Sequence, residues 1–318
     1  MAFRDSVPML FRLPIKTLLA SAIFVAVPAM AEEPEPLTFS NAINASSWSL
    51  DSSVFSCEMH HKVPYYGEAT VRTRAGEQSS LFLRGKTSRF LAGEAEIWSR
   101  SPVWVEGGES EKLGLVQLRA GTSPIWLSTA MTEQILKQLN QGHEVEFTKA
   151  TWFENEANPV ARLALSNIGF RGTYKKYLAC ITQLLPANFD QLKRSVLYFP
   201  AGDVKELPGE ARKILDEIIL LLKHDHKVRM LYVDGHTDSA GDPKDNLEIS
   251  KVRATMVRDY LTRHGVAENL ITLRWHGERY PVTSNATEKG RARNRRVTVR
   301  LEKAAKPTQQ ASAAETKK

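Results

Sequence analysis

The sequence predicts an α+β protein with two domains: a β-rich N-terminal domain, antiparallel and barrel-like, followed by a βαβ-type domain with a small mixed sheet. Between about residues 47 and 170, short runs alternate apolar with polar side chains, the period of strands with one buried face. From about residue 190, strands alternate with long helices that carry an apolar stripe. A chain of 318 residues is long enough for two such domains, which we place at residues 47–187 and 190–303.

The two ends of the chain are expected to lie outside these domains. An apolar run at 18–27 follows several basic residues and precedes a small–x–small triplet at 29–31, so residues 1–31 have the pattern of a cleaved secretory signal peptide. The run is too short for a stable membrane anchor, although an uncleaved signal anchor is the alternative. We expect residues 32–46, which are polar and Pro-rich, to be a flexible leading segment, and residues 304–318 to be disordered.

The elements of the N-terminal domain follow from this alternation and from glycines between the runs. Four runs are predicted to be strands, at 69–73, 80–84, 94–98 and 115–119. One helix interrupts them, capped by Ser128 or Thr129 and ended by Gly142. A second helix is predicted from about Tyr174 to Leu185.

The C-terminal domain is predicted to begin with a strand at 195–199 and a helix that opens at Pro208. A strand at 228–233 and a long helix from about Asn246 to His264 follow. Two further strands complete the sheet, at 270–275 and 297–301.

Two cysteines, Cys57 and Cys180, remain after removal of a signal peptide. Export to an oxidising compartment favours a disulfide between them. Since Cys57 lies in an early strand and Cys180 in the second helix, this bridge would join the beginning of the first domain to its end. The alternative is a pair of buried free thiols.

The composition is that of a soluble globular protein, with 42% hydrophobic and 25% charged residues. The formal net charge of +7 suits an anionic partner. Basic residues do not alternate with exposed aromatic residues along any stripe, so we do not expect a nucleic-acid partner.

A charged residue on the apolar stripe of the long helix marks a candidate binding site. Arg253 lies four residues after Ile249 and four before Val257, where a charge is costly unless it is paired. Asp238 lies in the preceding loop, and Asn246 or Asp245 lies where the helix cap belongs. A guanidinium, a carboxylate and a helix N-terminus together suit a zwitterionic amino-acid head group. The alternative is a structural Asp238–Arg253 salt bridge without a ligand.

Catalytic and metal chemistry have little support in the sequence. His236 is flanked by Asp234 and Asp238, but no further His or Cys is spaced to complete a metal site. Asp238 and Glu278 are carboxylates of the kind that a wall hydrolase uses, yet no nucleophile–base constellation accompanies them. We therefore expect a protein that is not an enzyme and that needs neither a metal nor a cofactor.

Several motif blocks in the last third of the chain occur in the order of a known family. They are 234–238 (DGHTD), 246–254 (NLEISKVRA), 277–278 (GE) and 290–297 (GRARNRRV). This region resembles the peptidoglycan-binding domain of OmpA, of the lipoprotein Pal and of flagellar stator B subunits. The resemblance implies that Asp238 and Arg253 hold the free end of meso-diaminopimelate in a stem peptide. It also implies that Thr237 and Asn246 line this pocket and that Asn294 and Arg295 border it.

The sequence departs from the family pattern at two places. Trp275-His276 precedes Gly277-Glu278 where many members have Gly-x-Gly-Glu, and a usual acidic or Asn residue is replaced near Ala201-Gly202. The second change removes a pocket contact, so we expect weaker wall binding than in the strongest members.

The front half of the chain resembles the flagellar MotY family. The segments that carry this resemblance are 48–50, 64–69, 102–109, 135–139, 147–152 and 165–181, together with the two cysteines. The resemblance implies a periplasmic protein on the outer-membrane side of the flagellar basal body, with a MotX-like ring protein and the stator B subunit as partners and peptidoglycan as its anchor. The alternatives are a general OmpA-like envelope protein without a role in motility and an enzyme that acts on the wall.

Overall fold

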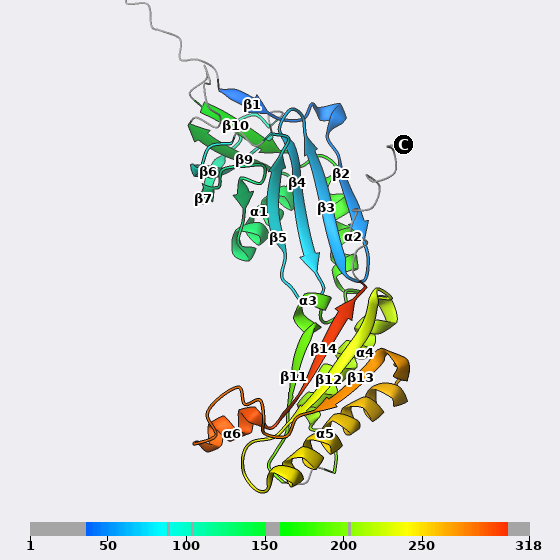
Figure 1. Cartoon of the computed structure of the whole chain (residues 1–318). Coiled ribbons are helices and arrows are strands. Elements are labelled where there is room, and N and C mark those ends of the chain that lie inside the picture. The colour runs from blue at the N-terminus through cyan, green and yellow to red at the C-terminus, as the bar shows by residue number, and fades with distance from the viewer. Residues whose placement is uncertain (1–35, 88–89, 103–104, 151–159, 203–204, 305–318) are drawn as a thin grey trace, which may run out of the picture. The chain divides into compact units, whose positions relative to one another are not determined.

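The computed structural model describes residues 36–87, 90–102, 105–150, 160–202 and 205–304 (Figure 1). The predicted signal peptide and C-terminal tail lie outside the described residues, as do parts of two MotY-like segments at 103–104 and 151–152. None of the helices within the described ranges is both long and apolar enough to cross a membrane.

The N-terminal domain is β-rich, as its alternating sequence predicts, and its strands form two five-stranded sheets. The first has the order β1-β10-β9-β6-β7, in which β1 and β10 run parallel and the other neighbours antiparallel. Its strands are β1 (Leu37–Phe39), β6 (Gly93–Arg100), β7 (Ser110–Leu118), β9 (Glu144–Ala150) and β10 (Val160–Leu165). Strand β1 lies in the segment expected to be flexible. It is ordered because it pairs with β10 and buries Phe39.

The second sheet has the order β2-β3-β4-β5-β8 and is antiparallel throughout. Residues from both sheets and from two helices share one apolar core. The strands are β2 (Trp48–Ser52), β3 (Ser56–Val63), β4 (Gly67–Arg74), β5 (Ser80–Gly85) and β8 (Ile125–Trp126), and a short 3-10 helix, η1 (Ile43–Ala45), precedes them.

Two helices complete this domain. Helix α1 (Thr129–Gln141) is capped by the Ser128 side chain and ends at Gly142, whose φ of 102° is left-handed and favours glycine. Helix α2 (Phe170–Ile181) begins four residues earlier than predicted, because Phe170 is buried and extends the apolar side of the helix. Cys180 of α2 is bonded to Cys57 of β3 with 6.1 Å between their Cα atoms, which confirms the predicted disulfide.

The segment before the C-terminal sheet is held by side-chain hydrogen bonds. Asn188 caps α3 (Phe189–Leu192) in a capping box with Gln191. The Asn188 amide also donates to the carbonyl of Ala75 at 2.9 Å and to the carboxylate of Glu77 at 2.8 Å. This connection is therefore bonded to the turn that follows β4.

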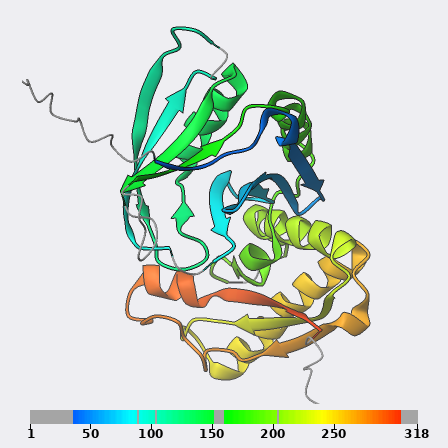
Figure 2. The ribbon, with the colours of Figure 1, turned by 90° about the horizontal axis from the view of Figure 1, so that it is seen from above.

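The C-terminal domain is a mixed four-stranded sheet with helices, which confirms the predicted fold class. The strand order is β11-β14-β12-β13, with β12 and β13 parallel and the other pairs antiparallel. Helices α4 and α5 lie on the same side of this sheet (Figure 2). The elements are β11 (Arg194–Tyr198), α4 (Gly209–His224), β12 (Val228–His236), α5 (Pro243–Arg263), η2 (Glu268–Leu270), β13 (Ile271–Trp275), α6 (Glu288–Asn294) and β14 (Arg296–Lys303).

A close approach brings α5 onto the end of β12. A Cβ atom on Gly235 would lie 2.0 Å from the carbonyl oxygen of Ser250, so only glycine fits there. The Ser250 hydroxyl accepts from the Gly277 amide at 3.0 Å. This packing sets Arg253 beside the carboxyl end of β12, where Thr237 and Asp238 follow.

Candidate functional site

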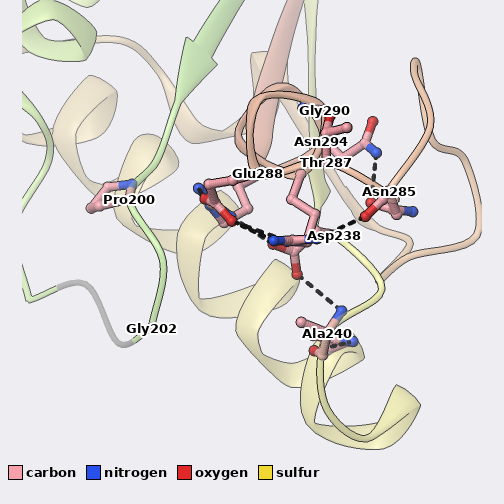
Figure 3. Close-up of polar contacts among 12 residues, drawn as sticks. Pro200, Gly202, Asp238, Ala240, Asn285, Thr287, Glu288, Gly290 and Asn294 are labelled. Atoms are coloured by element: carbon pink, nitrogen blue, oxygen red, sulfur yellow. Dashed lines mark hydrogen bonds and ion pairs between the residues drawn. The ribbon is translucent and has the colours of Figure 1, made fainter.

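Asp238 is the acidic centre of the site and is held by two hydrogen bonds (Figure 3). One carboxylate oxygen accepts from Nη1 of Arg295 at 2.7 Å, and the other accepts from the Ala240 amide at 3.2 Å. Both Asp238 and Arg295 are 7% exposed, so the ion pair is largely removed from water. The ion pair of Asp238 is thus with Arg295 and not with Arg253.

Arg295 connects Asp238 to a second carboxylate. Its Nη2 donates to Oε1 of Glu288 at 2.7 Å, seven residues earlier on α6. Burial disfavours the charged guanidinium, but the hydrogen bonds to Asp238 and Glu288 outweigh it and raise the pKa of Arg295. The guanidinium is therefore a fixed cation between two carboxylates.

Arg253 reaches the same end of the sheet from α5 and is 3% exposed. Its Nη2 donates to the carbonyl oxygens of Pro200 at 3.0 Å and Gly202 at 3.3 Å, and its guanidinium lies 5.5 Å from the centre of the Phe199 ring. The Phe199 amide donates to the carbonyl of Arg295. The loop that Arg253 contacts is thus bonded to the strand end that positions Asp238.

Thr237 lies between β12 and Asp238 and is 3% exposed. Its amide donates to the Gly277 carbonyl at 2.9 Å, whereas its hydroxyl is buried without a hydrogen-bond partner among the described residues. A buried hydroxyl without a partner costs free energy, and a polar ligand would satisfy it. This is the expected environment of a pocket-lining residue.

Asn246 lies inside α5, whereas the sequence predicted it at the start of this helix. The helix begins at Pro243, and its cap is Asp242, whose carboxylate accepts from the Lys244 amide at 2.7 Å. The predicted start at Asn246 was wrong because an Asp-Pro pair provides both a cap and a first helical residue one turn earlier. The Asn246 amide therefore donates to the Asp242 carbonyl and is not free for an anion.

The Asn246 side chain binds the surrounding loops. Its Nδ2 donates to the carbonyl of Ala240 at 3.1 Å and to the carboxylate of Glu278 at 2.8 Å. Since Ala240 also binds Asp238, Asn246 fixes the loop that carries the acidic centre.

Asn294 is fully buried and uses its whole amide group within the protein. Its oxygen accepts from the amides of Val282 and Thr283, and its nitrogen donates to the Thr283 carbonyl. The same nitrogen donates to the side-chain oxygen of Asn285 (Figure 3). Asn294, at the end of α6, therefore holds the loop of residues 282–285 against this helix.

His236 and Asp234 lie before the site on β12 and have other partners. Asp234 accepts from Arg274 at 2.5 and 2.9 Å and lies 3.2 Å from His276. Burial, then the nearby Arg296, lowers the pKa of His236 to about 4. Among the residues that the structure describes, no group of three or more His, Cys, Asp or Glu side chains is arranged to hold a metal ion.

Comparison with known proteins matches a different family model to each of the two domains. The model of the MotY N-terminal domain matches residues 39–186, and that of the OmpA family matches residues 198–295. The chain carries a MotY N-terminal domain followed by an OmpA domain. It is 26% identical over 262 residues to the sodium-type flagellar protein MotY of Vibrio parahaemolyticus, which covers 80% of this chain and 87% of that protein.

The OmpA domain has further relatives. It is part of a 121-residue match, at 31% identity, to the peptidoglycan-associated lipoprotein of Buchnera aphidicola, which covers 36% of this chain and 69% of that protein. The crystal structure of the peptidoglycan-associated lipoprotein from Burkholderia pseudomallei is 25% identical and has a TM-score of 0.32, covering 34% of this chain and 89% of that one.

All six predicted binding residues lie within the OmpA domain, but the structure divides them. It brings Asp238, Arg295 and Arg253 to one strand end with Thr237, whereas Asn246 and Asn294 hold loops. Sequence reasoning missed Glu288, the second partner of Arg295. The signal for it is the cap formed by Thr287, which begins α6 and places Glu288 in its first turn.

Proposed function

We propose that this protein is a non-enzymatic, periplasmic component of the flagellar motor that anchors to peptidoglycan through its OmpA domain. The ligand group in this proposal is the free end of meso-diaminopimelate in the stem peptide. The observation that carries the proposal is the convergence of buried Asp238, Arg295 and Arg253 at one strand end.

The charges of the site suit a zwitterion. The free end of diaminopimelate has an ammonium and a carboxylate on one carbon. Asp238 offers a carboxylate for the ammonium, and Arg253 offers a planar donor for the carboxylate. Thr237 adds a buried hydroxyl beside Asp238. Because Arg295 already neutralises one oxygen of Asp238, the ligand ammonium binds the remaining lone pairs and shares the carboxylate.

The MotY N-terminal domain supports the flagellar part of the proposal. A stator that pushes a rotor experiences an equal reaction torque, so a protein that positions it needs a fixed frame, and the wall is that frame. We propose a MotX-like ring protein and the stator B subunit as partners of the front domain, on the outer-membrane side of the basal body. Export by a cleaved signal peptide is part of this proposal.

Sedimentation with purified peptidoglycan tests the wall contact. Asp238→Ala and Arg253→Ala each remove one charge that pairs with the ligand, at a cost of about 1.5–3 kcal/mol, or roughly ten- to a hundredfold in affinity. Free meso-diaminopimelate should compete with the wall for the native protein and not for the variants. Matched controls are Asp245→Ala and Arg263→Ala, which remove exposed charges of α5.

Two results would decide against the proposal. Folded Asp238→Ala and Arg253→Ala proteins that pellet like the native chain would show that the pocket is elsewhere. Loss of wall polymer on incubation with the native protein would favour an enzyme instead. The motility role has a separate test: the tagged, exported front domain should form spots at flagellar bases, and a diffuse signal would leave a general envelope protein.

A further inference from the structure

The face of the C-terminal sheet that points away from α4 and α5 carries charged and aromatic side chains in register. One cross-strand row contains Arg194, Arg300 and Tyr232, paired across β11, β14 and β12. Helix-facing neighbours such as Leu197 are buried, whereas Arg194 is exposed and Arg300 and Tyr232 are half-buried. This row is therefore a solvent-facing surface. Together with Asp234, Arg274, Arg296, Tyr198 and His236, which lie on the same side of the sheet toward the wall-binding end, it forms the arginine face.

The arginine face places like charges directly opposite each other. Arg194 and Arg300 are a cross-strand pair, an arrangement that destabilises a sheet unless something neutralises it. Glu302 lies 3.5 Å from Arg300, and Arg194 has no ion pair among the described residues. Arg194 therefore has a cation directly opposite it on β14 and no carboxylate partner among the described residues.

Two guanidinium groups on this face, those of Arg300 and Arg274, are held in fixed orientations. Tyr232 lies between Arg300 and Arg274, with 4.5 and 4.7 Å from its ring centre to their central carbons. Arg274 is also fixed by its two bonds to Asp234. Because these side chains are already ordered, a ligand that binds them loses little additional side-chain entropy.

The end of the face nearest the wall-binding site is more buried: Arg296 is 5% exposed and donates to the carbonyls of Asn294 and Tyr280. Arg296 pairs across the strands with Tyr198 on one side and His236 on the other. His236 is 6% exposed, and its Nδ1 has no hydrogen-bond partner among the described residues. Tyr198 is 51% exposed. A second, independent feature of this face is thus a buried polar atom without a partner.

We propose that the arginine face binds an acidic, extended polypeptide segment of a partner protein. Charge complementarity selects an acidic partner, and ordered guanidinium groups suit carboxylates, which they bind through paired hydrogen bonds. Arginine and tyrosine are also among the residues enriched at the positions that contribute most binding energy in protein interfaces. Among the described residues of this face, Tyr198 is the only large hydrophobic side chain that is strongly exposed. Insertion into a lipid surface requires more exposed hydrophobic area, so the face favours a peptide.

The test uses the full exported chain and a short fluorescein-labelled polyglutamate peptide. Arg194→Ser combined with Arg300→Ser should weaken the anisotropy change at least about tenfold, because each serine removes a charged donor. The control pair, Arg212→Ser with Lys213→Ser, removes the same charge from exposed positions of α4 and should leave the affinity within about twofold. Affinity for the native chain should fall as salt rises.

A charge reversal keeps the test valid if the double variant unfolds. Arg194→Glu places a carboxylate opposite Arg300, so it should fold at least as well as the native chain and should abolish peptide binding. Its sedimentation with peptidoglycan should be unchanged, which separates this site from the wall pocket. Peptide binding that survives Arg194→Glu, or that the α4 control weakens equally, would overturn the proposal. Binding to phosphatidylglycerol vesicles without binding to polyglutamate would do the same and indicate a membrane contact.

Discussion

Replacement of Arg295 by alanine tests whether the Asp238–Arg295 pair builds the site. Nη1 of Arg295 lies 2.7 Å from Oδ2 of Asp238, and the two side chains are only 8% and 10% exposed, respectively. Removing one member of a buried ion pair costs about 3–5 kcal/mol, because the other charge stays buried without its partner. Asp238 keeps its bond from the Ala240 amide, so we expect the lower end, about 3 kcal/mol.

The two acceptors of Arg295 should contribute very differently. Glu288 is 63% exposed at its side chain, so Glu288→Gln should change stability little. Arg295→Lys keeps the charge but loses the paired geometry, and its effect should lie between those of the two other variants. Asp238→Ala together with Arg295→Ala should be less destabilising than the sum of the single changes, because no buried charge is left unpaired.

Hydrogen exchange in urea measures these differences within the full chain, through peptides from residues 228–303. The same proteins can be sedimented with peptidoglycan, where Arg295→Ala should bind poorly because Asp238 is no longer held in place. A loss below about 1 kcal/mol for Arg295→Ala, the range of an exposed pair, would refute the argument. So would strict additivity in the double variant.

Three further predictions concern other parts of the molecule. Loss of the Cys57–Cys180 bridge, which spans 123 residues, should lower the unfolding free energy by about 5 kcal/mol in the chain-entropy model; unfolding of the double alanine variant measures this, and wall sedimentation should persist. His236 stays neutral in the folded state down to about pH 4, whereas the unfolded chain takes up the proton near 6.5. Stability should therefore fall as the pH drops from about 6.5 to about 4, and His236→Gln should flatten that part of a stability profile. Asn188→Ala removes a helix cap, one buried donor contact and one part-buried donor contact, so urea unfolding should show a loss of about 2–3 kcal/mol, against little change for the exposed Asn140→Ala.

The sequence alone was enough to predict the fold class, because the two-residue alternation of strands and the apolar stripe of helices are local properties of the chain. Alternation of apolar residues over 69–73 and 80–84 became β4 and β5, and the apolar stripe around Val257 became the buried side of α5. The caps of α1 were also correct, since Ser128 and Gly142 act within a few residues of their own positions. The disulfide followed from the predicted export and from a count of two cysteines.

Boundaries that depend on distant partners were less predictable. Strand β1 has no strong pattern of its own and is ordered by pairing with β10, more than 120 positions later in the chain. The start of α2 at Phe170 depends on burial against Trp48, whose ring centre is 5.1 Å away. The start of α5 was the exception, because the Asp242–Pro243 signal was local and was overlooked.

For the site, motif residues identified the neighbourhood, and only the tertiary structure decided how they act. Nothing in the spacing of Asp238, Arg253 and Arg295 shows which arginine pairs with the carboxylate. That choice depends on how α5, α6 and the β11–α4 loop pack, which places Arg295 on Asp238 and directs Arg253 to the carbonyls of Pro200 and Gly202.

The same distinction holds for the arginine face. Arg194, Arg274, Arg296 and Arg300 appear in the sequence as scattered basic residues, because three different strands carry them. The registers of β11 with β14, of β14 with β12 and of β12 with β13 set them on one side of the sheet. The sequence by itself determined which segments become strands and helices, since periodicity and caps are short-range. The tertiary structure decided which charges meet, because ion pairs and cross-strand rows form between residues that only folding brings together.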